Sequence, residues 1–209
     1  MQKISPFLWF DDQAQEAANF YVSIFPNSWI LGVSRYGDGG PRLPGSAMSV
    51  TSTLDGLQIQ ALNGGPEFTF TEAISLFVSA VGQDEIDHLW DKLTSGGEPG
   101  RCGWLKDKYG LSWQIVPPIL NELLGDPDAD KASRVMQAML GMSKIDIAAL
   151  RAGTTATSGL GAPAGGGAAR IGARAAPVTA AEPRAEPERW QGDRDQGHQG
   201  PAAAMPADR

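Results

Sequence analysis

The chain has 209 residues and a formal net charge of −7, with 42% hydrophobic and 20% charged residues, which is ordinary for a globular protein. An acidic chain is a poor partner for nucleic acid, because nucleic acid is bound by a basic face. No apolar run approaches the ~20 residues of a membrane span, no signal peptide is visible, and the lone Cys102 excludes an internal disulfide. We expect a cytoplasmic protein that binds neither nucleic acid nor membranes.

The first part of the chain predicts a strand, a helix and three further strands. The helix has an apolar face at helical spacing, and Asp12 is its predicted N-cap. Asp55-Gly56 is a signal for a tight hairpin turn between the last two strands. The predicted elements are a strand over 4–10, a helix over 13–24, and strands over 29–36, 46–54 and 57–63.

The same order of elements then repeats. Residues 106–110 (KDKYG) form a turn between two strands, and the simplest interpretation of Lys106, Asp107 and Lys108 is a solvated turn. An alternative is that they gate a cavity or attract an anion. The predicted elements are a strand over 71–81, a helix over 83–94, and strands over 100–105 and 111–116.

Helices and a low-complexity segment complete the chain. Short helices are predicted over 119–124 and 145–150, and between them a longer helix opens at Asp126-Pro127-Asp128 with Pro127 in its first turn. Residues 153–209 are dominated by Ala, Gly and Pro, so they bury too little apolar surface to offset ordering, roughly 1–2 kcal/mol per residue. We predict one domain over 1–152, with modules of about 2–66 and 67–118 and a helical extension over 119–152, and a disordered tail over 153–209.

Five sequence words carry a family resemblance. They are residues 6–11 (PFLWFD), 17–21 (AANFY), 61–66 (ALNGGP), 103–107 (GWLKD) and 109–117 (YGLSWQIVP). Together they resemble the PhnB-like branch of the vicinal oxygen chelate superfamily, often labelled a 3-demethylubiquinone-9 3-methyltransferase domain. That superfamily includes glyoxalase I, bleomycin-resistance proteins and extradiol dioxygenases. The resemblance implies an α+β fold of two βαβββ modules that form an open, eight-stranded curved sheet around a cavity, and a homodimer that covers the strand edges.

The resemblance also implies positions for a metal site. Metal-dependent members place four ligands on the first and last strands of each module, and these positions fall on Ser5, Asn63, Ala73 and Gln114. Such side chains make a poor site, because protein metal sites are built from His, Glu, Asp or Cys. We therefore expect no metal and no cofactor, and no support for glyoxalase or dioxygenase chemistry. The one histidine of the globular part, His88, is expected to face solvent.

Strand alternation predicts which side chains line the cavity. The set combines aromatic walls with a few hydrogen-bonding groups, which is typical of small-molecule sites. Together with Asn63, it consists of Ser5, Phe7 and Trp9 on the first strand, Ala73, Ser75 and Phe77 on the fifth, and Ser112 and Gln114 on the last. Glu72 and Glu67 are weak candidates for a general base, and solvated loop carboxylates are the simpler interpretation.

The favoured function is binding of a small aromatic or hydrophobic molecule in a metal-free cavity of a homodimer. One alternative is an enzyme, either of methyltransferase type or a metal-dependent lyase or dioxygenase whose ligands lie elsewhere. The residues do not support methyl transfer, because no glycine-rich turn joins the first strand to its helix. A further alternative is sequestration of a planar toxic compound, as in bleomycin-resistance proteins.

Overall fold

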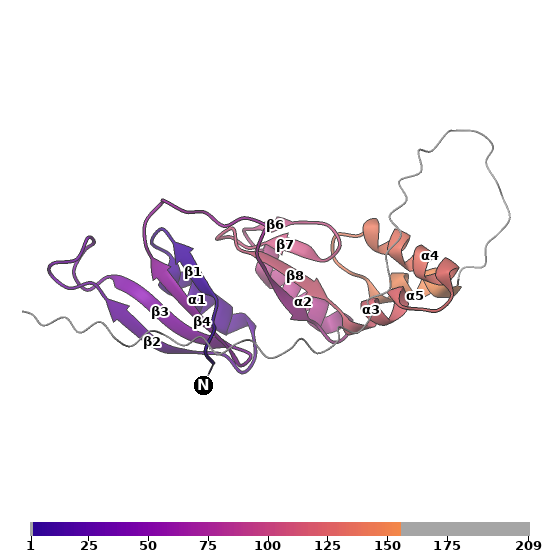
Figure 1. Ribbon diagram of the computed structural model, residues 1–209, viewed down its shortest axis with the longest axis horizontal. Coiled ribbons are helices and arrows are strands. Elements are labelled where there is room, and N and C mark those ends of the chain that lie inside the picture. The colour runs from indigo at the N-terminus through magenta and orange to yellow at the C-terminus, as the bar shows by residue number, and fades with distance from the viewer. Residues whose placement is uncertain (1, 156–209) are drawn as a thin grey trace, which may run out of the picture. The chain divides into compact units, whose positions relative to one another are not determined.

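The computed structural model describes residues 2–155, while residue 1 and residues 156–209 lie outside the described part. All described residues belong to one unit, residues 1–160. Figure 1 shows two βαβββ modules followed by three helices. Module 1 consists of β1 (Phe7–Phe10), α1 (Ala14–Ile24), β2 (Trp29–Arg35), β3 (Ala47–Leu54) and β4 (Leu57–Asn63). Module 2 consists of β5 (Ser75–Ser79), α2 (Gln83–Thr94), β6 (Glu98–Pro99), β7 (Trp104–Lys106) and β8 (Ser112–Val116). The helices are α3 (Pro118–Leu124), α4 (Ala129–Leu140) and α5 (Ile147–Thr155).

Each module forms its own four-stranded sheet with the same topology, so the expectation of one continuous eight-stranded sheet is wrong for the described residues. The strand orders are β1-β4-β3-β2 and β5-β8-β7-β6, and in each sheet the first strand pairs in parallel with the last strand of its module. The predicted α+β fold of paired βαβββ modules with C-terminal helices is therefore confirmed. The strands β1 and β5 each lie at the edge of their sheet, so one side of each backbone has no partner strand within the described residues.

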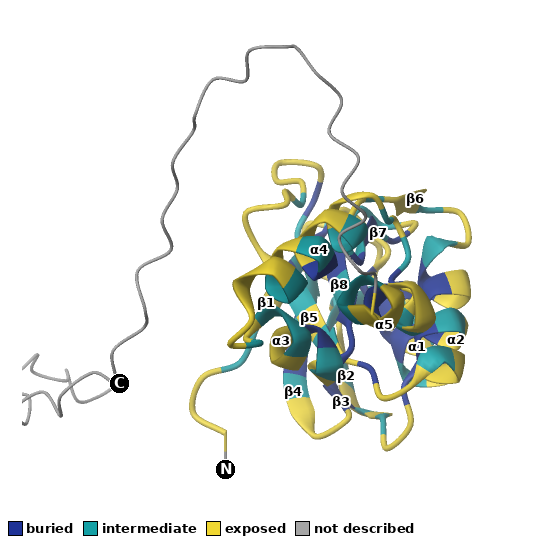
Figure 2. Cartoon of the chain, turned by 90° about the vertical axis from the view of Figure 1, so that its right-hand side faces the viewer, coloured by how far each residue is buried: buried dark blue, intermediate teal, exposed yellow. Residues whose placement is uncertain are grey.

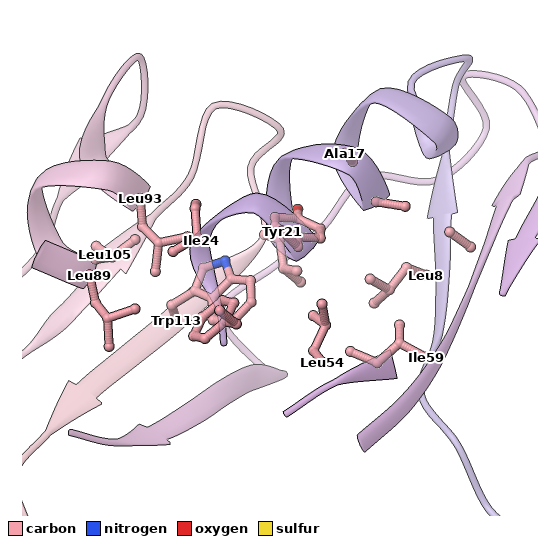
Figure 3. Close-up of a cluster of buried hydrophobic side chains, with 14 of the residues drawn as sticks. Leu8, Ala17, Tyr21, Ile24, Leu54, Ile59, Leu89, Leu93, Leu105 and Trp113 are labelled. Carbon is pink, nitrogen blue, oxygen red and sulfur yellow. The ribbon is translucent and has the colours of Figure 1, made fainter. Parts of the chain in front are cut away.

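One apolar core lies beneath both sheets (Figure 3). Leu8 and Ile59 of module 1 and Trp113 of module 2 are buried in it, and burial of such a side chain contributes roughly 1.5–3 kcal/mol. The Trp113 ring stacks on Phe25 at the end of α1, with 5.3 Å between ring centroids and an interplanar angle of 19°. The first helix thus packs against a strand of the second module as well as against its own sheet. Figure 2 shows that the helices turn a buried flank inward and an exposed flank outward.

The N-terminus of α1 is capped by a distant residue. The Oδ1 atom of Asn63 accepts a hydrogen bond of 2.7 Å from the Ala14 amide, while its Nδ2 atom donates to the Ala47 carbonyl at 3.0 Å. The prediction that Asp12 caps this helix is wrong, because Gln13 occupies the N-cap position and has no side-chain cap bond. Asn63, at the end of β4, therefore caps α1, whereas sequence patterns predict a cap from the residues that immediately precede a helix.

Three predicted strands are shorter by three or more residues in the structure. Residues 4–6 precede β1 and the turn around Glu72 precedes β5, so these strands begin at Phe7 and Ser75. The strand predicted over 100–105 begins only at Trp104, because Cys102 and Gly103 have positive φ angles of 56° and 83°. Such angles are incompatible with extended backbone, and they direct the chain into β7 from a turn.

The C-terminal helices form a second, smaller apolar cluster around Val135, Ile145 and Leu150. Asp128 caps α4 by accepting from two amides of the first turn, so Pro127 precedes the cap and the prediction that it lies inside the helix is wrong. The last helix includes the first three residues of the predicted tail, and the remainder of that tail lies outside the described residues. Within residues 2–155, none of the helices has both the length and the apolar character needed to cross a bilayer.

Candidate functional site

The candidate site lies on the face of each sheet that points away from α1 and α2, which we call the open face. On β1, Leu8 and Phe10 are buried on the helix side, so alternation places Phe7 and Trp9 on the open face. Phe7 is 56% exposed, although phenylalanine is most often buried in folded proteins. Both aromatic residues therefore share one face of the strand, as alternation predicts, but neither lines one of the cavities described below.

The open face of module 2 brings four of the predicted cavity residues together. In the parallel ladder of β5 and β8, Ser75 lies beside Ser112 and Phe77 lies beside Gln114. The Nε2 atom of Gln114 donates a hydrogen bond of 2.8 Å to the Ser75 hydroxyl. Phe77 is 56% exposed, like Phe7 on the equivalent strand of module 1. These four side chains form a small patch that is polar in the middle and aromatic at the sheet edge.

Three predicted cavity residues have other surroundings. The Ser5 hydroxyl, just before β1, accepts a hydrogen bond of 3.1 Å from Nε2 of Gln60. Ala73 lies in the exposed turn before β5 and is not part of the sheet. Asn63 is buried on the helix side of β4, and its place on the open face is taken by Leu62, the ladder neighbour of Trp9. Including Asn63 in the cavity was therefore a register error of one residue.

Trp9 is covered by the segment that links the two modules. Its indole Nε1 donates a hydrogen bond of 2.8 Å to the Gly65 carbonyl, and its ring meets the Phe68 ring edge-on at a centroid distance of 5.0 Å. A Cβ atom on Gly64 would lie 2.2 Å from the indole ring, so only glycine permits this close approach. Trp9 therefore holds the linker against the open face of module 1.

An apolar cavity of about 320 Å³ adjoins the edge strand β5. Its lining combines Phe77 with Leu76 and Trp113, which lie on the helix side of the sheet, so this cavity is not confined to the open face. The carboxylates of Asp55 and Glu85 are among its polar groups. An apolar hollow with a few polar groups is the usual form of a small-molecule site.

A smaller and more polar cavity of about 160 Å³ lies on the open face of module 2. Its lining includes Glu72, Glu98, Trp104, Lys106 and Ser112. The ammonium of Lys106 lies 2.5 Å from Oε1 of Glu72, and Glu98 neighbours Lys106 in the ladder of β6 and β7. Lys106 is thus placed between two carboxylates on adjoining segments.

Glu72 is held in its ionised form. The hydrogen bond from Lys106 lowers the pKa of the Glu72 carboxyl below its usual value, and a backbone hydrogen bond acts in the same direction. A general base that works near neutral pH needs a pKa raised toward neutrality. The geometry therefore makes Glu72 an ion-pair partner, because the hydrogen bonds that lower its pKa outweigh the small opposing effect of burial.

Asp107 lies at the turn between β7 and β8 and is buried, with 3% of its surface exposed. Its Oδ2 atom accepts hydrogen bonds from Tyr21 at 2.7 Å and from Trp113 at 2.8 Å. Its Oδ1 atom accepts from the amides of Tyr109 and Leu111 at 2.9 and 3.1 Å. The interpretation of Asp107 as part of a solvated turn is wrong. The neighbouring Lys108 does face solvent and pairs with Glu16 at 3.0 Å.

The positions that correspond to metal ligands in relatives do not fit a metal ion. Both side-chain amide atoms of Asn63 are hydrogen-bonded to backbone groups, and the side chain of Ala73 has no atom that could ligate a metal. The amide nitrogen of Gln114 is hydrogen-bonded to Ser75. Across residues 2–155, no three His, Cys, Asp or Glu side chains gather closely enough to bind a metal. His88 lies exposed on α2, as predicted, and lines a shallow hollow beside Asp84 and Glu85.

Two features of the site were not predicted from the sequence: the position of Trp104 and Lys106 on the open face, and the buried role of Asp107. Trp104 and Lys106 flank the buried Leu105, so alternation along β7 places both on the open face beside Gln114 and Ser112. Trp104 lies in the strand predicted over 100–105, so the alternation rule could have found it, whereas Lys106 falls in the turn predicted to follow. The role of Asp107 had no local signal, because its partner Tyr21 lies 86 residues earlier in the chain.

Comparison with known proteins identifies relatives for the modules. A profile of the 3-demethylubiquinone-9 3-methyltransferase family matches residues 2–116. A solved PhnB protein from Bacillus cereus is 39% identical, and the match covers 56% of this chain and 99% of that one, with a TM-score of 0.53. No curated protein matches the chain.

Two further solved structures are more distant. A Pseudomonas aeruginosa protein is 17% identical with a TM-score of 0.47, and the match covers 56% of this chain and 98% of that one. The fosfomycin resistance protein FosX from Listeria monocytogenes is 14% identical with a TM-score of 0.41, over 58% of this chain and 97% of that one.

Proposed function

The chain belongs to the 3-demethylubiquinone-9 3-methyltransferase family, the PhnB-like branch of the vicinal oxygen chelate superfamily. From this membership and the geometry of the site, we propose that the protein is a homodimer that binds a small aromatic or hydrophobic molecule in a metal-free cavity. The observation that carries the proposal is the apolar cavity beside β5, where Phe77 remains 56% exposed. An aromatic ligand that covers this ring would remove apolar surface from water.

Binding can be tested with 2-naphthol, a planar and neutral aromatic probe, by ligand-observed NMR on the full chain. We expect saturable binding that is weakened about tenfold by Phe77→Ser, because about 1.4 kcal/mol of apolar contact is lost. Leu43→Ser is the matched control, since Leu43 is 80% exposed and does not line the cavity. Absence of saturable binding, or equal loss in both variants, would contradict the proposal.

The homodimer is supported by the two edge strands. Phe7 on β1 and Phe77 on β5 are exposed on strands whose backbones have a free side among the described residues. Native proteins cover such edges, and a second copy can do so at both modules. Sedimentation of the wild type should give the dimer mass, and Phe7→Lys, which leaves the ligand-contacting Phe77 unchanged, should give a monomer, whereas Leu43→Lys should leave the dimer intact. A monomeric wild type would overturn the homodimer.

Methyl transfer is a second candidate, favoured by the description of the family that matches residues 2–116. Titration with S-adenosylmethionine separates the two. Saturable binding of this methyl donor supports an enzyme, and its absence alongside 2-naphthol binding supports a binding protein. Sequestration of a toxic compound is a form of the latter, in which the bound molecule is released unchanged.

A further inference from the structure

The Ser112 hydroxyl is buried and unsatisfied. Ser112 is fully buried, and its Oγ atom is the one buried side-chain nitrogen or oxygen of the described residues without a hydrogen-bond partner. Burying a hydroxyl in this state costs its lost hydration, so native proteins rarely keep one without a use. A serine at a position where alanine would fit therefore suggests that a partner for its hydroxyl arrives from outside the chain.

The surroundings of Ser112 show which partner that would be. The register places Ser112 beside Lys106 on the open face, and both residues line the cavity of about 160 Å³. Lys106 is already paired with Glu72 and lies beside Glu98. One lysine against two glutamates leaves an excess of one negative charge around the cavity.

We propose that this cavity is a subsite for the ammonium group of a small organic amine, held by the Ser112 hydroxyl, the carboxylates of Glu72 and Glu98, and the ring of Trp104. This inference rests on the proposed binding of a small molecule, and it specifies that the molecule carries a positively charged amino group. An ammonium N–H can donate to the free lone pairs of Ser112 Oγ. The negative excess attracts the cation, and a tryptophan ring gives it a favourable face.

An anionic ligand fits less well. A carboxylate would meet one ammonium, that of Lys106, against the two carboxylates of Glu72 and Glu98, so the net charge around the cavity would repel it. The excess of acidic residues also extends beyond the cavity, because the chain as a whole carries a net charge of −7. Its field favours the approach of cations over that of anions.

Benzylamine, benzyl alcohol and benzoate provide a matched set of probes, since they share one ring and differ in the charge of the polar group. Dissociation constants for the full chain can be measured by NMR titration at low ionic strength. We expect benzylamine to bind at least about tenfold more tightly than the other two, a difference that a hydrogen bond to a charged group can supply.

Three variants locate the effect. Ser112→Ala should weaken benzylamine binding about tenfold and leave the fold intact, because it removes only an unpaired hydroxyl. Glu72→Gln should weaken benzylamine and strengthen benzoate, since it releases Lys106. Glu98→Gln should weaken benzylamine, whereas Glu122→Gln on α3, which removes the same charge away from the cavity, should not.

The outcomes separate the subsite from the proposed function. If benzyl alcohol or benzoate binds as tightly as benzylamine, or if Ser112→Ala leaves benzylamine affinity within about twofold, the amine subsite is wrong while small-molecule binding stands. If none of the three probes and no 2-naphthol binds, both proposals fail. Selective benzylamine binding that depends on Ser112 and Glu98 supports the subsite.

Discussion

The Tyr21 hydroxyl donates a hydrogen bond of 2.7 Å to Oδ2 of Asp107, and this bond joins α1 of module 1 to the β7–β8 turn of module 2. The same oxygen accepts from Trp113, whose ring lies against Tyr21 and Phe25. Figure 3 shows Tyr21 beside Trp113 between the apolar side chains of the two modules. A buried carboxylate with four donors therefore lies at the junction that fixes one module against the other.

Asp107→Asn should destabilise the fold by about 2–4 kcal/mol, as expected for loss of a buried acceptor with several donors. An asparagine keeps one acceptor oxygen, and its amino group cannot accept from Tyr21 and Trp113. Denaturant unfolding measures the change in free energy. The control is Asp11→Asn, which removes an exposed ion pair with Arg42 and should cost less than about 1 kcal/mol. Equal costs for the two variants would contradict a structural role for the buried network.

The stability conferred by Asp107 should depend on pH in a direction set by burial. Burial raises the pKa of the Asp107 carboxyl above its usual value, although hydrogen bonds from Trp113, Tyr21 and two amides act to lower it. A raised pKa means that the folded state holds a proton that the unfolded state releases. The contribution is therefore complete below the unfolded pKa of about 3.9 and is lost as pH rises through the folded pKa.

The measurement is the difference in unfolding free energy between the wild type and Asp107→Asn from pH 3.5 upward, a starting point set near the unfolded pKa of about 3.9. The other titrating groups largely cancel in this difference. We expect the advantage of the wild type to fall with rising pH and then to become constant. An advantage that grows with pH would mean that the four hydrogen bonds outweigh burial.

Ser112→Ala and Ser75→Ala should change stability in opposite directions. The Ser112 hydroxyl has no partner, so its removal should stabilise the fold by about 1 kcal/mol in the absence of ligand. The Ser75 hydroxyl accepts from Gln114, so its removal should destabilise the fold by a similar amount. The two residues are neighbours in one ladder, which makes them a matched pair for thermal unfolding. A destabilised Ser112→Ala variant would show that its hydroxyl has a partner within the protein.

The architecture could be predicted from the sequence because its signals are local. The strand β4 and the helix α2 have the predicted bounds, since the Asp55-Gly56 turn and the spacing of Ile86, Leu89 and Leu93 each lie within a few neighbouring residues. The alternation of β8 likewise placed Ser112 and Gln114 on one face. Asn63 and Asp107 could not be placed this way, because the burial of each depends on α1, which contributes Ala14 and Tyr21 from far away in the chain.

Gly64→Ala should destabilise the fold by about 1–3 kcal/mol, the usual cost of forcing an extra methyl group into a packed site. The added Cβ would meet the Trp9 ring at 2.2 Å. The cost should shrink in a Trp9→Ala background, where the ring that it strikes is absent, so a double-mutant cycle should give a clear coupling energy. Gly39→Ala is the control, because nothing lies within 4 Å of a Cβ at that position. Additive changes at Trp9 and Gly64 would contradict the direct contact.

Asn63→Ala should destabilise the fold by about 2 kcal/mol or more, because it leaves the Ala14 amide and the Ala47 carbonyl without their side-chain partner. Asp12→Ala should change stability by less than about 0.5 kcal/mol, since Asp12 is exposed and α1 has no side-chain cap from its own segment. Denaturant unfolding of both variants tests which residue caps the helix. A larger loss of stability for Asp12→Ala than for Asn63→Ala would mean that Asp12 caps the helix after all. A larger loss for Asn63→Ala means that the end of β4 anchors α1, and thereby positions Tyr21 for its bond to Asp107.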